Sequence, residues 1–408
     1  MRMGLPVALS LVFACSSQSG APDAGPAAPK DAITVLLATR PAMKAPPFRV
    51  QVLTDLAVAL VDTGSVSRAR SLLSVAAQEA PHLSDPSDRE RTLGRLAVAA
   101  RKADDEATLG LALAKLSGSA KANALSETVR TLPDAMHIED AVSRDRALAR
   151  LGRELLTSGK LEEAGNAIAR IQDSSQKAPL VGLLATKKLE AGKNRDVDNW
   201  LRELDALPRA EVQASIAVWS MAHGNAKAAA RALKSIEPEQ IRARTLALQA
   251  IGSSGPTAAA LEAQAEKQIA DIQNKSQAAY ALEAVVRAWI PRHPANALAI
   301  LERAQRADSA PELRAAIAES FAQHGQLEQA EAQARALDGK PVAASVALAA
   351  LCRAYMAAHD RAQAWATLMR IRQAELAIPV LTELVARMEA PPSEAEIAAM
   401  RTVLTNTQ

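Results

Sequence analysis

Aromatic side chains are scarce in this sequence. Only 2% of its 408 residues are Phe, Trp or Tyr. Such side chains supply much of the buried area in most mixed sheet cores. No long run alternates apolar and polar residues with the period of two expected of strands. The scarcity therefore argues against a core built on sheets.

An excess of one charge is also lacking. The 48 Lys and Arg residues are nearly balanced by 45 Asp and Glu residues, which leaves a net charge of +3. The two signs are interspersed along the chain, so no basic stretch marks a nucleic-acid footprint. We therefore expect no nucleic-acid partner.

Small and aliphatic residues predominate in place of aromatic ones. Apolar residues make up 49% of the chain, and Ala and Leu dominate them. These two are the strongest helix formers, and small side chains let helix backbones approach one another closely. The expected fold class is therefore all-α.

The N-terminus has the pattern of an export signal. Arg2 supplies a positive start, and the ten apolar residues 5–14, LPVALSLVFA, follow it. Such a run is too short to span a bilayer as a helix but suits the apolar region of a signal peptide. We expect residues 1–14 to be a signal peptide.

The signal ends at Cys15, and the stretch LVFAC resembles a bacterial lipobox. Val12 and Ala14 fit that pattern, whereas Phe13 is bulkier than its usual residue. The resemblance implies cleavage before Cys15, acylation of its thiol and attachment to a lipid bilayer. Ser16 follows where a lipoprotein of the inner membrane has Asp, which favours the outer membrane and a protein that faces the periplasm. The alternative is an ordinary secretory signal with a chance cysteine.

Glycines recur at a nearly constant interval in the middle of the chain. Gly159, Gly192 and Gly224 are separated by 33 and 32 residues. Gly255 follows 31 residues later, and Gly325 lies about two further periods along. A period of this length is typical of stacked helical hairpins, each of which leaves an apolar face for its neighbours to cover.

The residues around these turns resemble tetratricopeptide repeats. That family has a small residue seven before the turn glycine, a large apolar residue four before it and alanine five after it. The matching sets are Gly152, Leu155 and Ala164 around Gly159; Ala318, Phe321 and Ala330 around Gly325; Ala57, Leu60 and Ala69 around Gly64; and Cys352, Tyr355 and Ala364 around His359. The resemblance implies a right-handed solenoid of antiparallel hairpins, and HEAT-type repeats are the alternative.

These observations divide the chain into segments. Asp104 stands where a turn glycine is expected, and an extra helix is expected near residues 121–132. The final helix follows Pro392, with Ser393 as its N-cap. The expected organisation is a signal peptide over 1–14, lipidated Cys15 and a mostly disordered linker over 15–46, irregular hairpins over 47–140, tetratricopeptide-like repeats over 141–390 and a helix capping the open end over 391–408.

The histidines beside the turns mark helix ends. His223, His324 and His359 lie at the end of a first helix, where an imidazolium interacts favourably with the exposed carbonyls. One histidine per hairpin makes a row, because helices pack about 8–10 Å apart and zinc ligands must converge within about 2.1 Å of the ion. We expect no metal site.

Motifs for catalysis are missing as well. The Gly-Lys pair near residue 160 lacks the spacing and hydroxyl of a phosphate loop, and no His-Glu-x-x-His or Gly-x-Ser-x-Gly is present. Cys352 lies on an apolar helix face, where a free cysteine behaves as a small hydrophobe. We expect neither an enzyme nor a bound cofactor.

Binding is the function that remains. The resemblance implies a concave groove lined by first helices, apolar in the middle and charged at its flanks. The residues of this sequence that correspond to the family's groove-lining positions are Arg146, Arg153, Val218, Met221, Val286, Trp289, Arg353 and Met356. We expect a membrane-anchored scaffold of the cell envelope that binds a protein or an extended peptide. The alternatives are a groove that holds a lipid or other apolar ligand, and a secreted repeat protein without a lipid.

Overall fold

The computed structural model describes residues 31–193, 197, 201, 204–304 and 310–406. In this part of the chain the secondary structure is helical throughout, with no strand. The helices form stacked antiparallel hairpins, which confirms the expected all-α solenoid. Residues 1–30, with Cys15 and the expected signal, lie outside the described residues.

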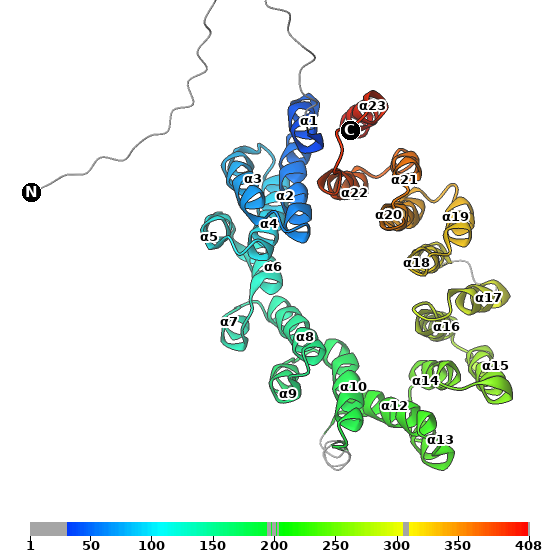
Figure 1. Cartoon of the computed structure of the whole chain (residues 1–408). Helices are drawn as coiled ribbons and strands as arrows, with labels where there is room; N and C mark the ends of the chain where they lie inside the picture. The colour runs from blue at the N-terminus through cyan, green and yellow to red at the C-terminus, as the bar shows by residue number, and fades with distance from the viewer. Residues whose placement is uncertain (1–30, 194–196, 198–200, 202–203, 305–309, 407–408) are drawn as a thin grey trace, which may run out of the picture.

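The hairpins are arranged as two concentric layers around an opening (Figure 1). First helices form the inner layer and second helices the outer layer. The inner helices are α2 (Pro46–Asp62), α4 (Pro86–Lys102), α6 (Gly118–Thr128), α8 (Ala141–Thr157), α10 (Ser174–Glu190), α12 (Ala206–Ala222), α14 (Glu239–Ile251), α16 (Lys275–Trp289), α18 (Ala310–Gln323), α20 (Pro341–Ala357) and α22 (Ala374–Ala386). The outer helices are α1 (Ala32–Thr39), α3 (Val66–Glu79), α5 (Glu106–Lys115), α7 (Leu132–Met136), α9 (Leu161–Ala169), α13 (Ala226–Lys234), α15 (Gly255–Asp271), α17 (Pro294–Ala304), α19 (Leu327–Arg335), α21 (Arg361–Leu368) and α23 (Glu394–Thr405). Short 3-10 turns, η1 (Arg40–Ala42) and η2 (Ala80–His82), follow α1 and α3.

The turns inside the hairpins explain the glycine spacing. Gly159 connects α8 to α9 with a φ of 74°, in the left-handed region that glycine adopts without strain. Asp104 and His359 hold the same conformation at their turns, with φ of 51° and 59°. Both residues therefore stand where a turn glycine was expected. Gly255 differs, since α14 has already ended at Ile251 and Gly255 opens the next helix.

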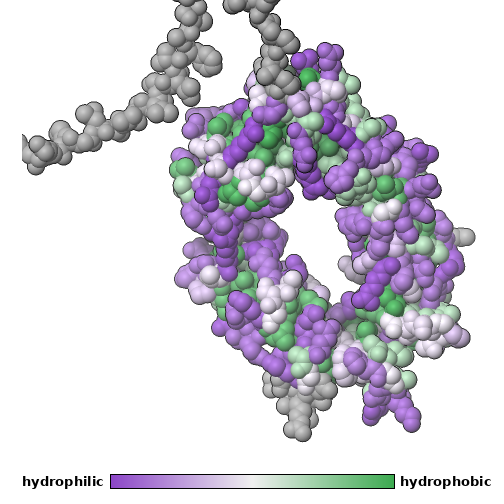
Figure 2. Space-filling model, in the orientation of Figure 1, coloured by the Kyte–Doolittle hydropathy of each residue, from purple (hydrophilic) through white to green (hydrophobic). Residues whose placement is uncertain are grey.

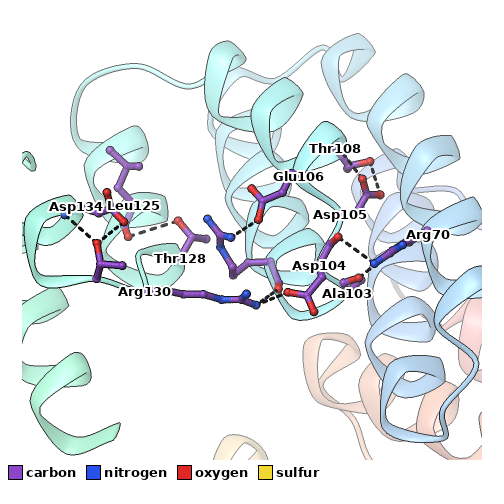
Figure 3. Close-up of polar contacts among 12 residues, drawn as sticks. Arg70, Ala103, Asp104, Asp105, Glu106, Thr108, Leu125, Thr128, Arg130 and Asp134 are labelled. Carbon is purple, nitrogen blue, oxygen red and sulfur yellow. Dashed lines mark hydrogen bonds and ion pairs between the residues drawn. The ribbon is translucent and has the colours of Figure 1, made fainter. Parts of the chain in front are cut away.

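Polar contacts surround the unusual turn at Asp104 (Figure 3). The Arg70 guanidinium of α3 donates to the carbonyl oxygens of Ala103 and Asp104, each at 3.0 Å. From the other side, Arg130 donates to the Asp104 carboxylate at 2.6 Å. Three successive hairpins therefore hold this turn, which offsets the cost of a left-handed backbone at a residue other than glycine.

His324 also ends a helix, as its place in the sequence predicts. Its Nδ1 lies 2.7 Å from the carbonyl oxygen of Ser320, one turn back along α18. Gly325 follows with a φ of 72°. The Ser320 carbonyl also accepts the backbone N–H of His324 at 3.0 Å, so the imidazole adds a second contact to a carbonyl of the last helical turn.

The two ends of the solenoid pack against each other, so the structure is a closed ring (Figure 1). Helix α2 lies beside α22, and α1 contacts both α22 and α23. One hydrophobic cluster crosses this seam and includes Leu36 of α1, Leu56 of α2, Leu381 of α22 and Leu404 of α23, all fully buried. On the N-terminal side of the seam, Arg40 of η1 forms a bidentate ion pair with Glu79 at the end of α3, at 2.6 and 2.9 Å, which holds η1 against the first hairpin.

Ring closure corrects two expectations at the ends of the chain. Residues 32–42 were expected in a disordered linker, yet they form α1 and η1, because Leu36 and its neighbours bury against α22 and α23. Helix α23 begins at the expected N-cap Ser393, which forms a capping box with Glu396. It does not cap an open end, since α1 packs against it and closes the ring.

The irregular segment is also more regular than expected. Instead of one extra helix near 121–132, the structure has the pair α6 and α7, a hairpin whose second helix is only five residues long. The ring therefore continues without interruption from α4 to α8.

Candidate binding site on the inner face of the ring

Three of the expected groove residues lie in the core. Val286, Trp289 and Met356 are at most 9% exposed and pack inside hydrophobic clusters. Val286 and Trp289 belong to α16, whose hairpin has no turn glycine to set the family register. In α16 and α20 alike, the apolar side of the helix faces its neighbours. The expectation that these side chains line an apolar groove is therefore wrong.

The other expected groove residues are more accessible. Val218 and Met221 of α12 are half-buried, whereas Arg146 and Arg153 of α8 and Arg353 of α20 are exposed. Two of the arginines join adjacent inner helices. Arg146 donates to the amide oxygen of Asn123 at 2.8 Å, and Arg353 forms a bidentate pair with Glu383, both contacts at 2.8 Å.

The inner layer surrounds an opening that passes through the molecule (Figure 2). Hydrophilic residues border much of this opening in the view shown. The opening is a property of the closed ring, and an open solenoid groove would not provide it. A site on the inner helices therefore faces an opening that the ring surrounds completely.

A cavity of about 710 Å³ lies where the ring closes, between α2, α4, α6 and α22. This volume is in the range of small-ligand sites. Apolar atoms come from residues such as Val58, Val98 and Pro379. Its charged and amide-bearing side chains are Gln51, Asp55, Glu90, Arg91, Arg95, Asn123, Glu127 and Glu375. A second cavity of about 240 Å³ adjoins it and shares Gln51, Arg91, Arg95 and Glu375.

Arg91 connects the two ends of the chain across this cavity. Its guanidinium pairs with Asp88 on its own helix and lies 3.7 Å from Glu375 of α22. Arg91 and Glu375 are about half exposed, so the pair contributes little stability. The contact places a cation of the first hairpins beside a carboxylate of the last one.

Asp55 is the most perturbed carboxylate of the cavity. It lies on α2 and accepts a hydrogen bond from the Gln51 amide at 3.1 Å. Burial raises the pKa of Asp55 to about 6, because the charged form loses hydration. Gln51 and Arg95 act in the opposite direction, and Glu383 of α22 raises the pKa further.

This cavity could not be predicted from the sequence. One local signal was present, because Asp55 is the only charged residue between Arg49 and Asp62 on an otherwise apolar helix. A carboxylate in such a position is unusual and is often functional. Its partners could not be found from the sequence, because they come from both ends of the chain.

Cys352 lies on the apolar side of α20, as expected. It is fully buried, and its thiol donates to the carbonyl oxygen of Ala364 at 3.2 Å. Burial raises the pKa of Cys352 to about 12. This thiol is therefore inert at neutral pH.

Metal-binding clusters and membrane-spanning helices are both absent from the described residues. No group of three or more His, Cys, Asp or Glu side chains there could hold a metal ion. Among the same residues, no helix has the length and apolar character needed to cross a membrane.

No family model matches the chain, and no curated protein matches it. Among solved structures it is similar to one described as "Circular tandem repeat protein with novel repeat topology and enhanced subunit contact surfaces", with 14% sequence identity. The alignment covers 91% of this chain and 97% of that one, with a TM-score of 0.16. At that score the likeness carries no argument, and the description of the chain as a helical repeat protein rests on its own stacked hairpins.

Proposed function

We propose that this protein is a ring-shaped scaffold that holds an extended segment of another protein against its inner face. The observation that carries the proposal is the cavity at the seam, whose walls come from four inner helices, α2, α4, α6 and α22. The mixture of charged, amide and apolar groups suits a polypeptide, which presents all three.

The proposal includes the family and the location expected from the sequence. The turn residues support a relationship to tetratricopeptide repeats, whose first helices line the binding surface. The signal and Cys15 support a lipid-anchored protein of the cell envelope on the periplasmic side of the outer membrane. Because α1 begins at Ala32, a linker of some fifteen residues would connect the lipid to the ring.

A lipid or other apolar ligand is less well supported. The seam cavity contains four carboxylates and two arginines, and an acyl chain would offer no partner to Asp55, Glu90 and Glu127, which form no ion pair among the described residues. The apolar residues that were expected to line the groove are instead used in the core. We therefore favour a protein ligand.

The binding surface can be tested with a photo-activated cross-linking residue placed in the cell at Val98, which is 39% exposed in the cavity. Val75, also 39% exposed but on outer helix α3, is the matched control. We expect a covalent protein adduct from position 98 and none from position 75. Adducts only from position 75 would show that the outer face binds the partner.

Anchoring is tested separately with Cys15→Ala. If the thiol is acylated, this variant remains an uncleaved precursor or is mislocalised, and metabolic labelling with a fatty acid is lost. Normal maturation and membrane retention of Cys15→Ala would exclude the lipoprotein assignment, while the scaffold proposal would stand.

A further inference from the structure

We propose that the cavity at the seam binds a basic side chain, lysine or arginine, of the segment held by the ring. This inference rests on the proposed scaffold function and specifies which residue of the partner the ring recognises. It depends on the charge of the cavity, on the free oxygen of Asp55 and on the apolar surface beside it.

The charge of the cavity favours a cation. Arg91 is already engaged by Asp88 and by Glu375. Three further carboxylates, Asp55, Glu90 and Glu127, face only one more cation, Arg95. None of those three forms an ion pair within the part of the chain that the structure describes. A ligand with one positive charge would reduce this excess of negative charge.

Asp55 provides the contact point. The Gln51 amide donates to its Oδ2 at 3.1 Å, and its Oδ1 accepts no hydrogen bond from the described residues. Asp55 forms part of the cavity wall, so an ammonium or guanidinium group in the cavity could donate to Oδ1. A charge-assisted hydrogen bond of this kind is stronger than one between neutral groups.

The surroundings of Asp55 suit the rest of a long basic side chain. Val58 lies one turn along α2, and Val98 and Gly94 face the same cavity from α4. Lysine and arginine bury their methylene groups along such apolar surface while the charged end reaches a carboxylate. A small cation such as sodium would leave this apolar surface uncovered.

Binding should then depend on pH, because Asp55 must be ionised to hold the cation. The charged groups around it are Glu90, Arg91 and Arg95 from α4, Glu127 from α6, and Glu375 and Glu383 from α22. With a pKa of about 6, the ionised fraction of Asp55 falls about tenfold between pH 7 and pH 5. The affinity for the cation should fall by a similar factor.

The test uses detergent-extracted full-length protein and a fluorescein-labelled heptapeptide, Ala-Pro-Ala-Lys-Ala-Pro-Ala, in fluorescence anisotropy. The matched peptide has norleucine, which has a similar length and no charge, in place of lysine. We expect the lysine peptide to bind at least tenfold more tightly at pH 7 and to lose about tenfold at pH 5. Asp55→Asn should remove the preference, as Glu127→Gln should in part, whereas Glu312→Gln, an exposed carboxylate on α18, should leave it unchanged.

Equal binding of the two peptides, or a preference that survives in Asp55→Asn, would overturn the inference. Circular dichroism of each variant shows whether a loss reflects unfolding, and Glu127→Gln provides a second reading from an exposed position. Failure of the peptide test with cross-links retained at position 98 would disprove only the choice of a basic side chain. Failure of both tests would disprove the scaffold proposal as well.

Discussion

Replacing Asp55 by Asn is expected to stabilise the ring at neutral pH. Burial raises the pKa of Asp55 from 3.8 to about 6, so the charged carboxylate destabilises the folded state relative to the unfolded chain. A difference of this size corresponds to about 3 kcal/mol. Because the side chain is only partly buried and solvent reduces the effect, we expect a gain of about 1–2 kcal/mol. Asparagine keeps the size of the side chain and can still accept the hydrogen bond from Gln51.

The stability gained by Asp55→Asn should become smaller as the pH falls. Between pH 3.8 and 6 the folded protein binds a proton at Asp55 that the unfolded chain has released, so the stability of the wild type falls as the pH rises through this range. Above pH 6 the full penalty is present, and below pH 3.8 it is absent. The two pKa values place the gain at pH 5 at about half of its value at pH 7.5.

Urea unfolding followed by circular dichroism, at pH 7.5 and pH 5, would measure this effect. The expected result is a higher midpoint for Asp55→Asn at pH 7.5 and a smaller increase at pH 5. A variant that is less stable than the wild type at pH 7.5 would refute the reasoning, since it would show that the carboxylate makes a favourable contact. Together with the peptide test, the result would show whether Asp55 lowers the stability of the fold while it increases the affinity for the ligand.

Three further substitutions test the packing, the turns and the closure. Gly182→Ala should lower the free energy of unfolding in urea by about 1–3 kcal/mol, because the added Cβ would lie 3.2 Å from the Cβ and the carbonyl oxygen of Glu211. In the control Gly165→Ala the nearest atom lies 3.6 Å from the added Cβ, so this variant should lose no stability. Equal losses in the two variants would contradict the packing argument. His359→Gly should raise the melting temperature through a gain of about 0.5–1 kcal/mol, because it relieves a positive φ; a lower melting temperature would mean that the imidazole is needed there. Leu36→Ala should cost about 2–5 kcal/mol and speed hydrogen exchange in α1, and unchanged protection of α1 would argue against its part in the closure.

The sequence predicted the hairpins well because their signals are local. Helix formers, an apolar face and a residue that tolerates positive φ all lie within about thirty residues, and Gly159, Asp104 and His359 were recognised on these grounds. The match to the family around Gly159 agrees with the packing as well, since Ala164 is fully buried.

The closure and the site could not be predicted in this way. Closure depends on the sum of small rotations between successive hairpins, and no single residue encodes that sum. The seam cavity depends in turn on the closure, because Asp55 meets Glu375 and Glu383 only when α2 lies beside α22. Trp289 was misplaced for a simpler reason: its hairpin turns without glycine, so the family register did not apply there.

Closure also limits how this protein can change in length. An open solenoid can gain or lose a unit at small cost, since each unit contacts only its neighbours. In a ring the rotations of all units must add up to one full turn, so a duplicated hairpin would separate α1 and α2 from α22 and α23. Closure therefore constrains the number of hairpins as a whole. We expect relatives of this protein to vary far more in the residues of their exposed surfaces than in the number of their repeats.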